Sequence, residues 1–192
     1  MKTTAQKIRY NITRTLNRAT PQNIEAGLTW YAKARANARE IAEENGRTLE
    51  EIAEVISILS PFNRWHSNLD QASALTFAHT FAPDEEKLAE AVSKIPFTTF
   101  ENNVVKALAR LEGSKVLTPQ SRKTYNFAQN IRGNLELVTI DRWILRAINY
   151  PSDSLTPKEY DQIQDIFQEY AHQRTHYKPA QLQAIIWETV RV

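Results

Sequence analysis

The chain has 192 residues and no cysteine, which excludes disulfide bonds, a thiolate zinc site and a thiolate-held iron–sulfur cluster. Apolar residues make up 42% and charged residues 24%, an ordinary globular composition, and the mean hydropathy of −0.51 excludes an integral membrane protein. The net charge is only +2, yet basic residues gather in two segments, 1–18, which holds no acidic residue, and 114–146. These segments predict a surface that faces a polyanion, although solvated helix faces would have the same composition.

Helices are expected along the whole chain. Ile8, Ile12 and Leu16 recur every four residues, the spacing of one helix face, and residues 65–81 show a similar spacing. Capping residues or prolines that begin helices stand at Thr20-Pro21, Thr48, Pro83, Thr99, Thr118-Pro119, Asp141, Thr156-Pro157 and Pro179. Gly46, Gly113 and Gly133 mark helix ends. The pattern predicts an all-α protein with nine or ten helices, whereas the apolar run 137–140 is too short to assign.

The candidate residues for binding and catalysis lie in the segment 117–146. A helix that begins at Thr118-Pro119 leaves unpaired backbone amides, which attract anions. Ser121, Arg122, Lys123 and Thr124 fall in or next to its first turns, where they suit a phosphate. Asp141 stands where it can cap a second helix, so a lysine and a carboxylate lie beside two helix starts.

In this segment the sequence resembles the helix-hairpin-helix DNA glycosylase superfamily, most closely its endonuclease III-like members. That family has a hairpin of the form L-P-G-V-G-x-K-T, one following helix, and a V-D-x-H/W-x-x-R motif. The positions that fit these motifs are Leu117, Lys123, Thr124, Asn126, Val138, Ile140, Asp141, Trp143 and Arg146. The chain departs from the family where Pro119 and Ser121 replace the two hairpin glycines, and where Phe62-Asn63-Arg64 replaces an upstream glutamine. It also lacks the four cysteines that hold the cluster of endonuclease III itself.

The resemblance implies a two-lobed all-α fold. Residues 46–134 would form a helical barrel lobe that includes the hairpin, and residues 1–45 and 135–192 would form the other lobe. It further implies a cytoplasmic or nucleoid-associated monomer that binds double-stranded DNA and needs no cofactor and no metal. His172 and His176 have the spacing of two metal ligands but no evident third one, so no metal site is expected.

The activity that the resemblance implies is cleavage of the N-glycosidic bond of a damaged or modified base that is flipped out of DNA. Asp141 would stabilise the positive charge that develops on the sugar, and Lys123 would be the amine of an additional lyase reaction. Phe62, Asn63 or Arg64 would fill the gap that the base leaves. Further DNA contacts are expected from Thr118, Ser121, Arg122, Thr124 and Arg142.

Other interpretations of the same residues remain. Asp141 could be only a helix cap, and Lys123 could be a solvated or phosphate-binding lysine. A protein of this fold could also modify the bases of hypermodified viral DNA instead of excising them. A third possibility is a DNA-binding module without catalysis, which the lost hairpin glycines favour.

Overall fold

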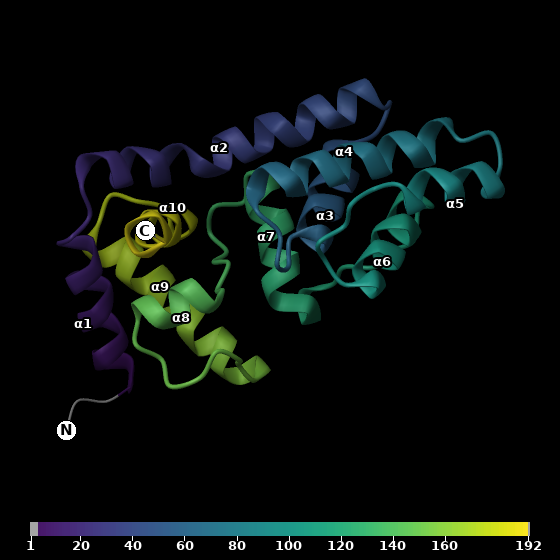
Figure 1. Cartoon of the computed structure of the whole chain (residues 1–192). Coiled ribbons are helices and arrows are strands. Elements are labelled where there is room, and N and C mark those ends of the chain that lie inside the picture. The colour runs from purple at the N-terminus through teal and green to yellow at the C-terminus, as the bar shows by residue number, and fades with distance from the viewer. Residues whose placement is uncertain (1–3, 192) are drawn as a thin grey trace. The chain divides into compact units, whose positions relative to one another are not determined.

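The computed structural model describes residues 4–191, and within them it contains ten α-helices, one 3₁₀-helix and no strand. This confirms the predicted all-α class. None of the helices in this range combines the length and apolar character needed to cross a membrane. The elements in chain order are α1 (Thr4–Leu16), α2 (Pro21–Glu44), α3 (Leu49–Leu59), α4 (Trp65–Phe81), α5 (Glu85–Ser93), α6 (Glu101–Leu111), η1 (Pro119–Ser121), α7 (Arg122–Arg132), α8 (Arg142–Ala147), α9 (Pro157–Arg174) and α10 (Pro179–Val190) (Figure 1).

The chain forms two compact units. Met1–Lys33 and Pro119–Val192 together form one, here called the terminal unit, and Ala34–Thr118 forms the other, the central unit. The boundaries differ from the predicted ones, because residues 34–45 join the central unit and residues 119–134 join the terminal unit. Helix α2 crosses the first boundary without a break.

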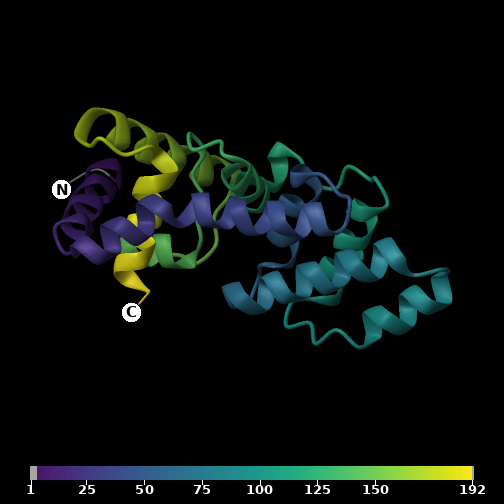
Figure 2. The same ribbon diagram turned by 90° about the horizontal axis from the view of Figure 1, so that it is seen from above.

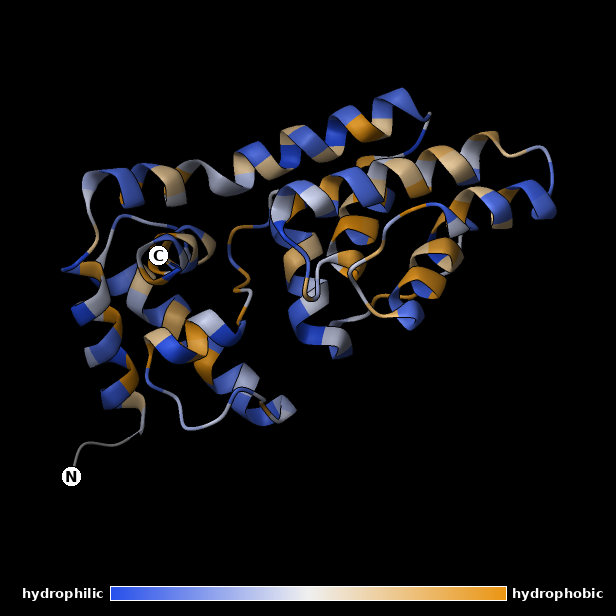
Figure 3. Ribbon diagram, in the orientation of Figure 1, coloured by the Kyte–Doolittle hydropathy of each residue, from blue (hydrophilic) through white to orange (hydrophobic). Residues whose placement is uncertain are grey.

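In the terminal unit, α1, α8, α9 and α10 pack around one apolar core (Figures 1 and 2). Ile12 of α1, Ile144 of α8, Phe167 of α9 and Leu182 of α10 are all fully buried there. The hydrophobic stretches of the α1 ribbon, coloured orange in Figure 3, lie on the side of the helix towards α8 and α9. Burial of a side chain of this size contributes about 1.5–3 kcal/mol, so this core holds together two chain segments that are far apart in sequence.

In the central unit, α3 is the core helix. Every residue from Ile52 to Leu59 is buried, and α4 and α6 pack against it. Eight consecutive residues go around a helix about twice, so α3 needs neighbours on every side, which explains its position between α4 and α6. Helix α5 contacts α4 but has no buried residue of its own.

A cluster of charged groups joins α3, α4 and α6 near the start of α3. The carboxylate of Glu54, which is 8% exposed, accepts a hydrogen bond from Arg110. Arg47 donates to the backbone oxygen of Leu111 at 2.9 Å, and one of its other nitrogens lies 2.9 Å from Nδ1 of His79. Burial and the Arg47 guanidinium both lower the pKa of His79.

The helix starts agree in part with the predictions. Thr48 and Thr156 form the capping boxes that their sequences suggest, and Asp141 caps α8. Two other predicted starts are wrong: α5 begins at Glu85 with Asp84 as its cap, and Phe100 instead of Thr99 precedes α6. The chain after Thr118 is a further correction, because Pro119–Ser121 forms a 3₁₀ turn and α7 begins only at Arg122.

The close approach of α2 and α10 within the terminal unit makes Gly27 a sensitive position. A Cβ atom at Gly27 would lie 2.5 Å from both the backbone nitrogen and the Cα of Ile185. Alanine favours a helix over glycine by about 1 kcal/mol, but overpacking costs about 1–3 kcal/mol and backbone atoms cannot rotate away. We expect Gly27→Ala to lower the free energy of unfolding by about 2 kcal/mol in urea denaturation. A gain in stability would contradict this packing.

The lowered pKa of His79 predicts a pH dependence of stability. Below pH 6.5, the ordinary pKa of histidine, the unfolded chain takes up the proton more readily than the folded chain does. The free energy of unfolding should therefore decrease as the pH falls through this range towards 5, and His79→Gln should make the decrease smaller. Denaturation curves at several pH values test this, with His66→Gln as the control, because His66 is exposed.

Candidate functional site

The segment Leu137–Ile140, which could not be assigned from sequence, is neither helix nor strand, and three of its residues are buried. Side chains from α7 and α9 supply the hydrogen bonds that a regular element would have supplied. Asn126 of α7 donates to the backbone oxygen of Val138 at 3.0 Å, and Gln164 of α9 accepts from the backbone nitrogen of Val138 at 3.2 Å. Buried backbone groups need such partners, so these side chains fix the path of the segment.

Two further residues complete this support. The Tyr160 hydroxyl accepts a hydrogen bond from the Ile140 nitrogen at 3.1 Å and donates to the Val138 oxygen at 2.9 Å. Burial raises the pKa of Tyr160 far above its ordinary value, so the hydroxyl remains a donor. Asn130 donates to the oxygen of Leu137 at 2.9 Å and accepts from the Thr139 hydroxyl at 2.8 Å.

Asp141 follows this segment directly and is half-buried. Its Oδ1 accepts hydrogen bonds from the backbone nitrogens of Trp143 and Ile144, both at 2.9 Å, and thereby caps α8. Its Oδ2 accepts from Nε1 of Trp187 in α10 at 3.1 Å. A carboxylate has about four acceptor positions, and groups of the protein fill three of those of Asp141.

An aromatic cluster surrounds the Trp187 end of this carboxylate. The Trp187 ring lies 5.9 Å from the ring of Trp30, which lies 5.8 Å from the ring of Phe127. All three rings are half-buried, and the Arg191 guanidinium lies 4.1 Å from the centre of the Trp187 ring. Together they form a partly open aromatic surface next to a carboxylate.

Tyr31 forms the buried base of the cluster. Its ring lies 4.8 Å from that of Trp30, and its hydroxyl donates to Oε1 of Gln183 at 2.7 Å. Burial, more than any other factor, raises the pKa of Tyr31, and the nearby charge of Asp141 acts in the same direction. Tyr31 therefore stays neutral and serves to hold the cluster and α10 in place.

The predicted phosphate-binding residues before and at the start of α7 have different environments. Arg122 donates two hydrogen bonds to Asp161, at 2.8 and 2.9 Å, so a counter-charge already holds its guanidinium. Lys123 is exposed, Thr124 is half-buried, and Ser121 precedes α7 without a side-chain capping bond. Lys123 comes one helical turn before Phe127, which places it on the side of α7 that carries the aromatic cluster.

Basic residues also follow Asp141. The guanidinium groups of Arg142 and Arg146, both exposed, lie 5.7 and 5.2 Å from the centre of the Trp143 ring. Arg146 also pairs with Asp153 at 3.7 Å. On α9, His172 contacts Glu136 at 2.9 Å, and no three His, Asp or Glu side chains gather as metal ligands within the described part of the chain.

The remaining predicted DNA contacts, Thr118 and the three proposed wedge residues, belong to the central unit. Phe62 has a φ of 63°, an unusual value for a bulky residue, and its ring is 69% exposed. Asn63 is occupied, because it donates to Gln71 and accepts from Thr98 at 2.9 Å. Arg64 is exposed at the N-cap position of α4. The ring of Phe62 lies 5.1 Å from that of Phe100, so Phe62 combines an exposed side chain with a strained backbone and one aromatic neighbour.

The structure thus brings together residues that the sequence did not connect. Asp141 was identified from its motif, whereas Trp187, Trp30 and Phe127 were not assigned to the site. Trp187 contacts Asp141 across 46 residues of sequence, and no local pattern signals that contact. The one available hint was chemical: an N-cap aspartate uses one oxygen for the cap and leaves the other to find a donor.

Fold and site define an all-α protein of two compact units, in which a helix-capping carboxylate borders a half-buried aromatic cluster. Over residues 1–192 the sequence matches the family described as "Family of unknown function (DUF7178)", and the chain belongs to that family. No curated protein and no solved structure matches the chain.

The hydrogen bond between Trp187 and Asp141 can be tested by stability. In Asp141→Asn the remaining oxygen can keep the cap, but the new amide group then turns two N–H donors towards the Trp187 N–H. We expect a loss of about 1 kcal/mol in the free energy of unfolding, and almost no loss when the same change is made in Trp187→Phe. Urea denaturation of both single variants and the double variant measures this coupling.

Asp84 provides the matched control for that measurement. It also caps a helix, with one hydrogen bond from the backbone nitrogen of Lys87 at 2.8 Å. Asp84→Asn should leave stability nearly unchanged, because asparagine caps a helix about as well as aspartate does. Equal losses for Asp84→Asn and Asp141→Asn would argue against the Trp187 contact.

Proposed function

We propose that the protein is a DNA-binding enzyme that cleaves the N-glycosidic bond of a base flipped out of the duplex, with Asp141 as its essential carboxylate. The observation that supports this most is the anchoring of Asp141, whose carboxylate is held in one direction by three hydrogen bonds from the protein. The resemblance of residues 117–146 to helix-hairpin-helix DNA glycosylases assigns this same residue to catalysis.

Cleavage of an N-glycosidic bond requires the carboxylate to stabilise positive charge and to accept a proton. When the bond between C1′ and the base breaks, its electron pair leaves with the base, and positive charge remains on the sugar. A fixed negative charge nearby stabilises that transition state, because it needs no reorganisation during the reaction. Water then forms a bond to C1′, and Asp141 accepts the proton that this water loses. The departing base takes up a proton from solvent, and Asp141 returns its own proton to solvent, so that no net charge is left on the enzyme.

The aromatic cluster supplies the second requirement. A base that leaves the stack loses a few kcal/mol of stacking and pairing energy, and an aromatic protein surface can replace part of it. Trp187 both contacts Asp141 and belongs to the cluster with Trp30 and Phe127. A base stacked there would have its sugar near the carboxylate.

A second candidate, a DNA-binding module without catalysis, is favoured by the hairpin region. The 3₁₀ turn Pro119–Ser121 has a proline, which lacks an N–H, where the resembled family has a glycine. Arg122 is already paired with Asp161, and most acceptor positions of Asp141 are filled within the protein. Such a protein would bind DNA and leave its bases intact.

Base release distinguishes the two candidates. Duplexes with single uracil, alkylated or oxidised bases are incubated with the protein, and released base is measured by mass spectrometry. We expect release from at least one duplex, a loss of 100-fold or more (roughly) in Asp141→Asn, and wild-type activity in Asp84→Asn.

Borohydride trapping on abasic DNA tests Lys123: a covalent adduct that is lost in Lys123→Ala indicates an additional lyase reaction. Salt-sensitive binding with no release from any duplex would instead support the module.

Binding itself predicts a difference between two neighbouring residues. Lys123 is exposed and makes no ion pair with any described residue, whereas Arg122 is held by Asp161. Each phosphate contact adds about 0.9 to the slope of log K against log salt. Lys123→Ala should lower the slope by about that amount and Arg122→Ala by less, as measured by fluorescence anisotropy over a salt series. The reverse order would mean that Arg122 leaves Asp161 to contact phosphate.

A further inference from the structure

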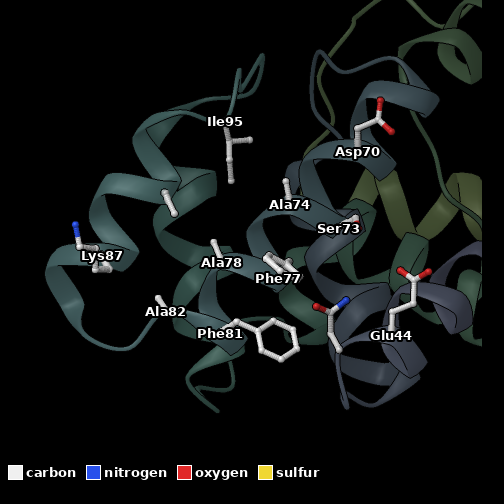
Figure 4. A pocket seen from close by; sticks show the side chains of 12 residues that line it. Glu44, Asp70, Ser73, Ala74, Phe77, Ala78, Phe81, Ala82, Lys87 and Ile95 are labelled. Carbon is white, nitrogen blue, oxygen red and sulfur yellow. The ribbon is translucent and has the colours of Figure 1, made fainter.

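A hollow of about 780 Å³ opens on the central unit, between the end of α2, α4 and α5 (Figure 4). Its apolar wall includes Phe77 and Phe81 of α4, whose rings lie 4.8 Å apart and are 60% and 57% exposed. Its polar wall includes Glu44, Asn45 and Asp70. A volume of this size suits a small organic ligand.

Asn45 carries an unsatisfied group in this wall. The side chain is 5% exposed, and its Nδ2 donates to the backbone oxygen of Ile41 at 2.8 Å. Its Oδ1, in contrast, is buried and has no hydrogen-bond partner among the described residues. A buried oxygen without a donor is costly, and Asn45 is part of the lining of the hollow, so a ligand there has an unpaired acceptor to bind.

The charges around the hollow define what kind of donor this is. Glu44 and Asp70 have no ion-pair partner within residues 4–191, whereas Lys87, which also lines the hollow, is paired with Glu90 at 2.8 Å. Glu90 is shared with Lys94, which lies 2.7 Å from it, but in the lining itself two carboxylates stand against one ammonium group. The faces of Phe77 and Phe81 also attract cations. The unpaired oxygen of Asn45, the two carboxylates and the two phenyl rings all favour the same kind of ligand group. That group is a positively charged N–H donor.

We propose that this hollow binds a small amphipathic amine. The protonated amine donates to Oδ1 of Asn45 and lies near the carboxylates of Glu44 and Asp70, while the apolar body of the ligand covers Phe77 and Phe81. Oδ1 is closed to solvent when the hollow is empty, so the wall must adjust as the amine enters. This site is independent of the DNA-binding function proposed for Asp141.

Phenethylamine is the direct probe of this site. Two compounds serve as comparisons: 3-phenylpropionate and trimethyl-phenethylammonium. Saturation-transfer NMR and calorimetry on the full chain should show that phenethylamine binds at least tenfold (roughly) more tightly than the carboxylate does. The quaternary analogue keeps the charge but has no N–H, so it should bind several-fold more weakly than the primary amine. Equal binding of all three compounds, or no binding of the amine, would overturn the proposal.

Variants locate the site. Asn45→Leu should weaken phenethylamine about tenfold, since it removes the acceptor of a charged hydrogen bond. Asp70→Asn and Phe81→Ala, at exposed positions that do not endanger folding, should each weaken it several-fold. Glu43→Gln and Phe100→Ala are the matched controls, because both residues are exposed but lie outside the hollow, and neither should change binding. Unchanged affinity in the first three variants would mean that only water satisfies Asn45.

Discussion

Buried backbone without regular structure must find its hydrogen bonds in side chains, and for Leu137–Ile140 four polar residues provide them. Asn126 and Asn130 are one turn apart on α7, and Tyr160 and Gln164 are one turn apart on α9. The segment is thus held between two helices by polar pairs at the same spacing. Loss of one of these side chains would leave buried backbone groups without partners, at a cost of about 1–3 kcal/mol each.

The site depends on this support because Asp141 is the next residue in the chain. The position of its carboxylate follows from where the segment ends, and the cap on α8 then fixes its direction. Trp187 completes the arrangement from α10, which is packed against α8 in the core of the terminal unit. The structural role of Asp141 as a helix cap is therefore compatible with the catalytic role proposed for it. The hydrogen bonds that make it a cap are also those that would hold a catalytic carboxylate still.

The sequence predicted those features whose cause lies within a few residues. The capping boxes at Thr48 and Thr156 and the cap at Asp141 each involve partners at most three residues away, so their sequence pattern is sufficient. The start of α7 was predicted three residues too early, because a proline after a threonine fits a 3₁₀ turn as well as an α-helix. The contact of Trp187 with Asp141 and the pairing of Arg122 with Asp161 join distant segments, and only the fold establishes them.

For function, the most important contacts that the sequence could not predict are those between charged residues. The basic segments predicted a surface that faces a polyanion, yet the fold supplies acidic partners from outside these segments: Arg9 pairs with Glu169, Arg122 with Asp161 and Arg146 with Asp153. Exposed pairs of this kind are worth little to stability, and a phosphate can compete for them only by displacing a carboxylate. Attraction to DNA would therefore rest on cations that keep no carboxylate partner within residues 4–191, such as Lys123 and Arg142. Both belong to the segment that contains Asp141, so these two charges and the fixed carboxylate lie on one short stretch of chain.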